Sequence, residues 1–177
     1  MKKWIIGIGA LLIMQIIVSC DKKDDAPKYQ CDLNSSNYLN VTANGSNNKF
    51  SGNDIAGGFM RNEGVDRSYS IYDVGFYKDK VYNTLNVKFD TLVTPGNYTL
   101  ADIASAEIMY DAADQKTNFI ELNFNISHLD ETYVETFNNN VFYYSYASGS
   151  FEGKYLHPIT ADTVTITGTF CSDPIPE

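Results

Sequence analysis

Residues 162–170 indicate the fold class, because they run Asp-Thr-Val-Thr-Ile-Thr-Gly-Thr-Phe. From position 163 onward, threonine at the odd positions alternates with apolar or small residues at the even positions. A period of two is that of an extended strand with one face on a core and the other in water. Half-buried strands of this kind are typical of antiparallel sheets. The segment therefore predicts an antiparallel strand.

The same alternation recurs along most of the chain. Tyr82–Asp90 and Phe119–Ser127 have it clearly. Further strands are expected at Tyr38–Ala43, Ile55–Met60, Ser68–Tyr77, Ala106–Ala112, Val141–Ala147 and Ser150–Leu156. We therefore expect an all-β chain, a single antiparallel β-sandwich of about nine strands, with a small lipocalin-like barrel as the alternative.

Turn residues separate these strands. Asn44-Gly45 is typical of a type I′ hairpin turn, and Pro95-Gly96 suits the centre of a type II turn. Residues 138–140 are three consecutive asparagines, which tolerate left-handed backbone.

The N-terminal residues resemble a bacterial lipoprotein signal. Lys2 and Lys3 precede an apolar run over residues 4–18, which is short for a membrane-spanning helix. Residues 17–20, Ile-Val-Ser-Cys, resemble a lipobox, in which the cysteine is acylated and becomes the first mature residue. This resemblance implies a signal peptide at 1–19 and a lipidated Cys20, which a flexible tether at 20–30 follows. The expected strands place the β-sandwich domain at 31–177.

The tether carries a second resemblance. Lys23-Asp24-Asp25 is similar to the acidic export signal of Bacteroidota surface lipoproteins, which would direct the protein to the outer face of the outer membrane. A polar tether contains such residues by chance as well, and Asp21 would imply inner-membrane retention in enteric bacteria. We expect an outer-membrane lipoprotein that is either surface-facing or periplasmic.

The domain itself resembles small Bacteroidota lipoproteins of unknown function. The resemblance rests on Asn44-Gly45, on the stretch Thr-Pro-Gly-Asn-Tyr-Thr-Leu at 94–100, on Ser-Gly-Ser-Phe at 148–151 and on the strand at 162–170. It implies no catalytic chemistry. Two Asp-Thr-aliphatic triplets also match the O-glycosylation pattern of Bacteroidota, with Thr91 and Thr163 as the acceptors.

Charge restricts the partners of this protein. The 177 residues carry a net charge of -9, and no cluster of more than two adjacent basic residues occurs. Nucleic acid is therefore not an expected partner, because its binding depends on cations that neutralise phosphates. An acidic body is also repelled by anionic lipid, so membrane contact is expected through the N-terminal lipid.

Residues able to carry catalysis are sparse. A metal site would combine His128 with two of Asp130, Glu131 and Glu135, but this spacing matches no known ligand pattern. The sequence also has no nucleophile elbow and no phosphate-binding glycine-rich loop. We expect no metal, no cofactor and no enzymatic activity; a hydrolase that uses two carboxylates stays as a less favoured alternative.

Aromatic residues suggest a binding surface. Phe142, Tyr143, Tyr144 and Tyr146 place large rings on both faces of one strand. An exposed row at Tyr143, Tyr144 and Tyr146 would bind a glycan or a protein, and the alternative is that these rings pack beneath a loop. The predicted role is binding or structure in the cell envelope, with a lipocalin-like carrier of a small apolar ligand as the alternative.

Two cysteines would remain after lipidation, Cys31 and Cys171. An even pair in an oxidising compartment predicts a disulfide. Cys31 precedes the first strand and Cys171 ends the last, on the threonine side that faces away from the core. The alternative is two separately buried thiols.

Overall fold

The computed structural model describes residues 38–51, 54–64, 68–111 and 115–172, apart from the side chains of residues 131–133. The strands are β1 Tyr38–Ala43, β2 Ser46–Ser51, β3 Ile55–Glu63, β4 Ser68–Lys78, β5 Val81–Phe89, β6 Gly96–Thr99, β7 Ser105–Met109, β8 Thr117–Phe137, β9 Asn140–Leu156 and β10 Thr163–Ser172. Among the described residues there is no helix that is long and apolar enough to cross a membrane.

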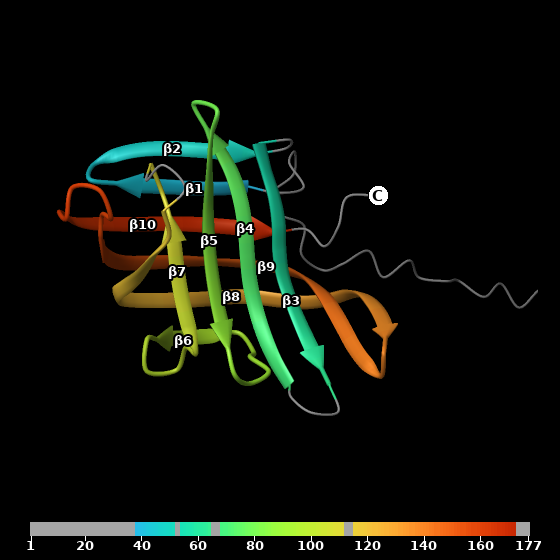
Figure 1. Cartoon of the computed structure of the whole chain (residues 1–177). Helices are drawn as coiled ribbons and strands as arrows, with labels where there is room; N and C mark the ends of the chain where they lie inside the picture. Colours follow the sequence, from blue (N-terminus) through green and yellow to red (C-terminus); the bar gives the residue numbers. More distant parts are fainter. Residues whose placement is uncertain (1–37, 52–53, 65–67, 112–114, 173–177) are drawn as a thin grey trace, which may run out of the picture.

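All ten strands belong to one sheet, in the order β2-β1-β10-β9-β3-β4-β5-β7-β8-β6, with a further pairing of β8 with β9. Every pair is antiparallel. The sheet folds into two layers: β2, β1, β10, β9 and β8 run across the back layer, and β3, β4, β5 and β7 cross them steeply in the front layer (Figure 1). Layers that cross in this way are joined at corners by strands that change partner.

The long strands β8 and β9 form this corner. β9 pairs with β3 over residues 141–145 and with β10 over residues 147–156. Irregularities in the β8–β9 register bend the pair at three places. Six strands also form a closed ring of pairings, because each pairs with the next and the last pairs with the first: β3, β4, β5, β7, β8 and β9. The all-β antiparallel prediction is therefore confirmed, while the pairing combines the layers of a sandwich with the closure of a barrel.

Local predictions are confirmed at most places. The first strand has the predicted bounds, and the two segments expected at 141–147 and 150–156 form a single strand, β9. Asn44 and Gly45 have φ of 46° and 82°, and Asn138 and Asn139 have φ of 49° and 62°. The type II turn at Pro95-Gly96 is wrong, because Gly96 lacks a positive φ and begins β6 opposite Ile126.

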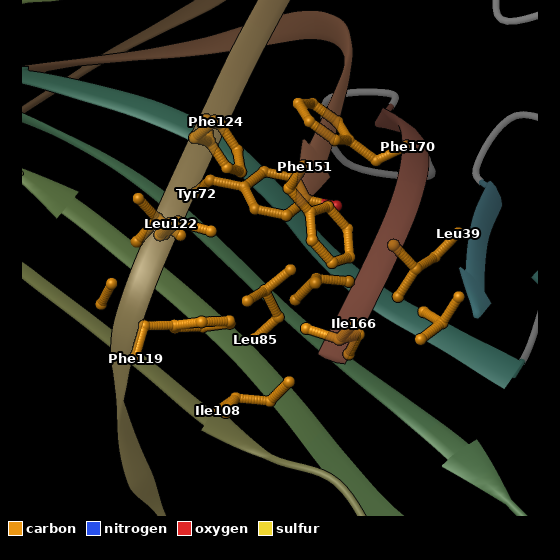
Figure 2. Packing of buried hydrophobic residues seen from close by; sticks show 14 of the residues in the cluster. Leu39, Tyr72, Leu85, Ile108, Phe119, Leu122, Phe124, Phe151, Ile166 and Phe170 are labelled. Carbon is orange, nitrogen blue, oxygen red and sulfur yellow. The ribbon is translucent and has the colours of Figure 1, made fainter. Parts of the chain in front are cut away.

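Aromatic side chains fill the space between the layers (Figure 2). Tyr72 of β4 lies with its ring centroid 4.4 Å from Phe170 of β10 and 5.6 Å from Phe124 of β8. Phe124 and Phe170 stack at 5.1 Å. Because β4 belongs to the front layer and β8 and β10 to the back layer, this ring cluster holds the layers together.

Two Gly-x-Phe triplets face each other across β9 and β10. Gly149 lies opposite Phe170, and Phe151 lies opposite Gly168. Each ring covers the glycine of the other strand: a Cβ at Gly149 would lie 2.7 Å from Phe170 Cζ, and a Cβ at Gly168 would overlap the Phe151 ring. Rings that cover cross-strand glycines favour one register over its neighbours. The interlocked pairs therefore fix how β10 is aligned on β9.

Candidate binding face

The outer face of the back layer is hollowed. The hollow has a volume of about 740 Å³, and it extends across β2, β1, β10, β9, β8 and β6. Amide and hydroxyl side chains form most of its lining. They point outward because strand side chains alternate, and their neighbours in each strand point into the core. We call this surface the polar hollow.

The polar hollow is built from two rows of side chains that run across the strands. The first, the Asn40 row, has one residue from each of the six strands: Lys49, Asn40, Thr169, Ser150, Asn125 and Asn97. Each member lies directly opposite the next in the strand register. Neighbouring strands are about 4.8 Å apart, so the row repeats at about that spacing over roughly 24 Å.

The second row lies two residues along each strand. This Thr42 row consists of Asn47, Thr42, Thr167, Glu152 and Asn123. All five also line the hollow. The rows are about 6.7 Å apart, which is the length of two extended residues. The arrangement is a regular grid of donors and acceptors.

Hydrogen bonds hold the amides of the Asn40 row in place. Asn40 Nδ2 donates to Thr169 Oγ1 at 3.1 Å, and Asn125 Nδ2 donates to Asn97 Oδ1 at 2.7 Å. Ser127 Oγ donates to Asn125 Oδ1 at 2.7 Å. These contacts orient the side chains before any ligand arrives, which lowers the entropy cost of binding.

The charge of the polar hollow differs from that of the whole chain. Lys49 and Glu152 are the charged side chains among its lining residues, so their formal charges cancel. The chain as a whole carries a net charge of -9. This face is therefore suited to an uncharged polar ligand rather than to an ion.

The tyrosines expected to form a binding surface lie elsewhere. Tyr143, Tyr144 and Tyr146 are all half-buried in β9, and none of them lines the polar hollow. The Tyr143 hydroxyl donates to Glu63 Oε2 at 3.2 Å, and its ring lies 5.3 Å from Arg61 Cζ. Arg61 in turn lies 3.9 Å from Glu63. Tyr143 thus connects β9 to β3.

The histidines are not gathered into a metal site. His128 Nε2 lies 2.7 Å from Asp130 Oδ2, and His157 Nε2 lies 3.3 Å from the Asp111 carbonyl oxygen. No group of three metal-ligating side chains occurs in the part of the chain that the structure describes.

A second polar cluster lies where β4 ends and the residues after β7 begin. Lys78 donates to Asp111 and lies 4.9 Å from the Tyr110 ring centroid, while Asn48 Nδ2 donates to the Tyr110 hydroxyl at 2.9 Å. Burial alone would lower the pKa of Lys78, but the bonds to Asp111 and Tyr110 raise it above its usual value. Since its members bond to one another, the cluster joins β2 and β4 to the residues that follow β7.

The remaining predicted residues have these positions. Thr91 and Thr163 are both exposed. Cys171 lies on the threonine side of β10, as expected, but it is only 3% exposed. It is therefore covered, unlike the threonines of that strand. Cys20 and Cys31 lie outside the described residues, and both the lipid and the Cys31–Cys171 disulfide stay predictions.

Sequence reasoning did not identify the polar hollow. Its residues are the outward positions of ordinary amphipathic strands, and their side chains are typical of solvated sheet faces. The alternating positions of the strands do carry one signal. The outward positions of 40–49, 123–125 and 167–169 are rich in asparagine and threonine rather than in charged residues. These residues form rows only when the register of six strands is known.

Comparisons of this chain with family models, with curated proteins and with solved structures found no match.

Proposed function

We propose that this protein is a lipid-anchored component of the cell envelope that binds a neutral glycan in the polar hollow. The observation that carries the proposal is the pair of registered rows, in which uncharged amides and hydroxyls predominate.

The chemistry of these rows matches that of a sugar. Each saccharide hydroxyl both donates and accepts hydrogen bonds, and an asparagine amide offers a donor and an acceptor side by side. Asn40, Asn125 and Asn97 repeat this pair along a single row. An extended polymer that lies across the strands would meet such a group at each strand, so several weak contacts add up along the chain.

The packed interior supports a surface site over an internal one. A carrier of a small apolar ligand needs an enclosed apolar cavity of a few hundred Å³. Here the space between the layers holds Tyr72, Phe124, Phe151 and Phe170, all of them buried. A carboxylate-dependent hydrolase needs two facing acids, whereas Glu152 is the one carboxylate among the residues that line the hollow.

Envelope location rests on the lipobox resemblance at residues 17–20. Replacing Cys20 with serine should release the protein into the soluble fraction or block its processing, because the acyl chains would no longer hold it. Processed and membrane-bound Cys20→Ser protein would contradict the lipid anchor. Replacing Lys23, Asp24 and Asp25 with alanine tests surface display separately, through loss of protease access in intact cells.

The burial of Cys171 supports the proposed disulfide with Cys31, since it lies on the otherwise exposed side of β10. A bridge there would join the chain before β1 to the last strand, and closure of so long a loop is worth up to about 5 kcal/mol. Mass spectrometry of the non-reduced mature protein should find no alkylatable thiol. Two alkylated thiols would contradict the bridge.

Binding itself is tested with immobilised polysaccharides. The purified full-length lipoprotein in detergent is measured against neutral glucans, mannans, xylans and galactans, with heparin and polygalacturonate as charged comparators. We expect retention by at least one neutral polymer and loss of that retention in an Asn40→Ala/Asn125→Ala variant. Preference for a charged polymer, or equal retention of the variant, would overturn the proposal.

Asn86→Ala is the matched control. Asn86 lies on the outer face of β5 in the front layer, opposite Asp73 and Glu107, and it does not line the hollow. The control removes the same amide from a similar strand position. We therefore expect it to leave polysaccharide retention unchanged.

A further inference from the structure

The turn of the β8–β9 hairpin exposes an aromatic side chain at one end of the molecule. Phe137 is 63% exposed, which makes it the most exposed large apolar residue in the part of the chain described, and Val134 nearby is 53% exposed. The turn itself consists of Asn138 and Asn139 in left-handed conformations. We call residues 134–141 the hairpin tip.

The strand directions place this tip at the same end as the start of β1. β1 is antiparallel to β10, and β10 is antiparallel to β9, so β1 and β9 point the same way. Tyr38, where β1 begins, lies opposite Cys171, which lies opposite Ser148 of β9. The chain thus enters the domain at the end from which the hairpin projects (Figure 1).

The hairpin reaches well beyond this entry point. β9 begins at Asn140, so its first eight residues lie before the level of Tyr38, a length of about 26 Å along the bent strand. β3 pairs along Val141–Ser145 and supports the hairpin, so that the turn extends from a braced strand pair. The 17 residues between Cys20 and Tyr38 can span at most about 60 Å. A chain held at Cys20 can therefore bring the tip to the surface that holds it.

We propose that the hairpin tip inserts into the lipid surface beside the N-terminal anchor, with Phe137 at the level of the headgroups and upper acyl chains. The inference rests on the lipid anchor of the proposed function, and it adds a second contact that orients the domain.

Lipid fits the tip better than a protein groove does. Val134 and Phe137 are three residues apart in β8, so they point to opposite faces of the hairpin. A protein groove contacts one face, whereas lipid surrounds both. Glu135 is the one charged residue among 134–141, and the tip has no basic residue, so a zwitterionic surface suits it better than an anionic one.

This orientation leaves the polar hollow accessible. Ser150 of the Asn40 row lies ten residues along β9 from Asn140, a length of about 33 Å measured along the bent strand. With the tip at the bilayer, the hollow faces sideways above the headgroups. A polymer could then lie across the strands without contacting the membrane.

The test uses tryptophan as a depth probe, because the chain from residue 20 onward contains none. Phe137→Trp is introduced, and the processed lipoprotein is placed in phosphatidylcholine vesicles with and without lipids brominated in the acyl chain. Tyr77→Trp is the matched control: Tyr77 is 53% exposed and lies beyond the opposite end of β3. Bromolipid should quench the Phe137→Trp protein several-fold more strongly than the Tyr77→Trp protein, and insertion should shift the emission of the former to the blue.

A second arm separates this inference from the anchor. The chain from residue 20 is held on nickel-chelating phosphatidylcholine vesicles through an N-terminal histidine tag, which replaces the lipid. Preferential quenching of the Phe137→Trp protein there supports the inference even if Cys20 is not acylated. Equal quenching of the two variants, or a blue shift of the Phe137→Trp protein without quenching, as contact with protein would cause, overturns it.

Discussion

The inner and outer faces of the β9–β10 pair differ in what their side chains do. On the inner face, Phe151 and Phe170 each cover a glycine of the other strand. Adding a single methyl group to either glycine should therefore disturb the packing. On the outer face of the same strands, Ser150 and Thr169 lie opposite each other at the surface of the polar hollow. One hydrogen-bonded ladder thus supports both a tightly packed core and a preformed polar grid.

If the polar hollow binds a glycan as proposed, this difference divides stability from binding within the domain. Packing fixes the register, and the register then places the outward side chains in rows. Substitutions on the inner face should therefore change stability first, whereas those on the outer face should change binding alone. Adjacent residues such as Thr169 and Phe170 allow the two effects to be measured one position apart.

The largest effect is expected for Phe170→Ala. This side chain is fully buried, and its ring contacts both Tyr72 and Phe124. Removing it should lower the free energy of unfolding by about 3–5 kcal/mol, because a large cavity replaces the ring between the layers. Urea denaturation measures the loss, and a change below about 1 kcal/mol would contradict the central role of the ring cluster.

A smaller loss is expected for Gly168→Ala. The new Cβ would overlap the Phe151 ring and lie 2.6 Å from the Asn40 carbonyl oxygen, so ring and strand must move. We expect destabilisation of about 1–3 kcal/mol. Gly96→Ala is the matched control, since a Cβ there meets no atom closer than the 3.7 Å of Tyr98 Oη. Equal denaturation midpoints for the two variants would show that the interlock does not set the register.

Much of this inner face could be predicted from the sequence. The alternation in residues 162–170 reports burial directly, and residues 149–151 and 168–170 repeat the same Gly-x-Phe triplet. Even so, the nine-strand estimate differs from the ten strands observed, because 141–147 and 150–156 join in β9 while β2 and β6 are further strands. Local periodicity does not show whether a strand continues through a bend.

The polar hollow could not be predicted in the same way. Asn97 and Lys49 are 48 residues apart in the chain, and they belong to one row only because four strands lie between them. Sequence patterns report which face a side chain takes, but they do not report which distant strands become neighbours. The Tyr143–Tyr146 segment differs in this respect, because its large rings are evident from the sequence of a single strand.

Alkaline pH should lower the free energy of unfolding of the unsubstituted protein, because two buried tyrosines belong to the inner face. Burial raises the pKa of Tyr72 and of Tyr155 above the usual value of 10. Their contribution to stability is therefore fully present below pH 10 and is lost as the pH rises toward the folded-state values. Each pH unit above 10 should lower the free energy of unfolding by roughly 1 kcal/mol for a fully buried tyrosine such as Tyr72. Denaturation midpoints across this range should fall less steeply in Tyr72→Phe, and identical slopes would contradict the assignment.

The smallest change in stability is expected for Thr169→Val, on the outer face next to Phe170. Valine keeps the β-branched shape that favours a strand, and the position is exposed, so the free energy of unfolding should change by less than about 0.5 kcal/mol. The lost group is the hydroxyl that accepts a hydrogen bond from Asn40 Nδ2.

If the Asn40 row binds a glycan, that hydroxyl matters twice, because it orients the Asn40 amide and is itself within reach of a ligand. The loss of about one hydrogen bond, roughly 1 kcal/mol, should weaken retention on the neutral polysaccharide about fivefold. Thr169→Ser, which keeps the hydroxyl, should restore most of that retention. A Thr169→Val protein that binds normally but unfolds more easily would mean that the outer row serves the fold, and the division between the two faces would fail.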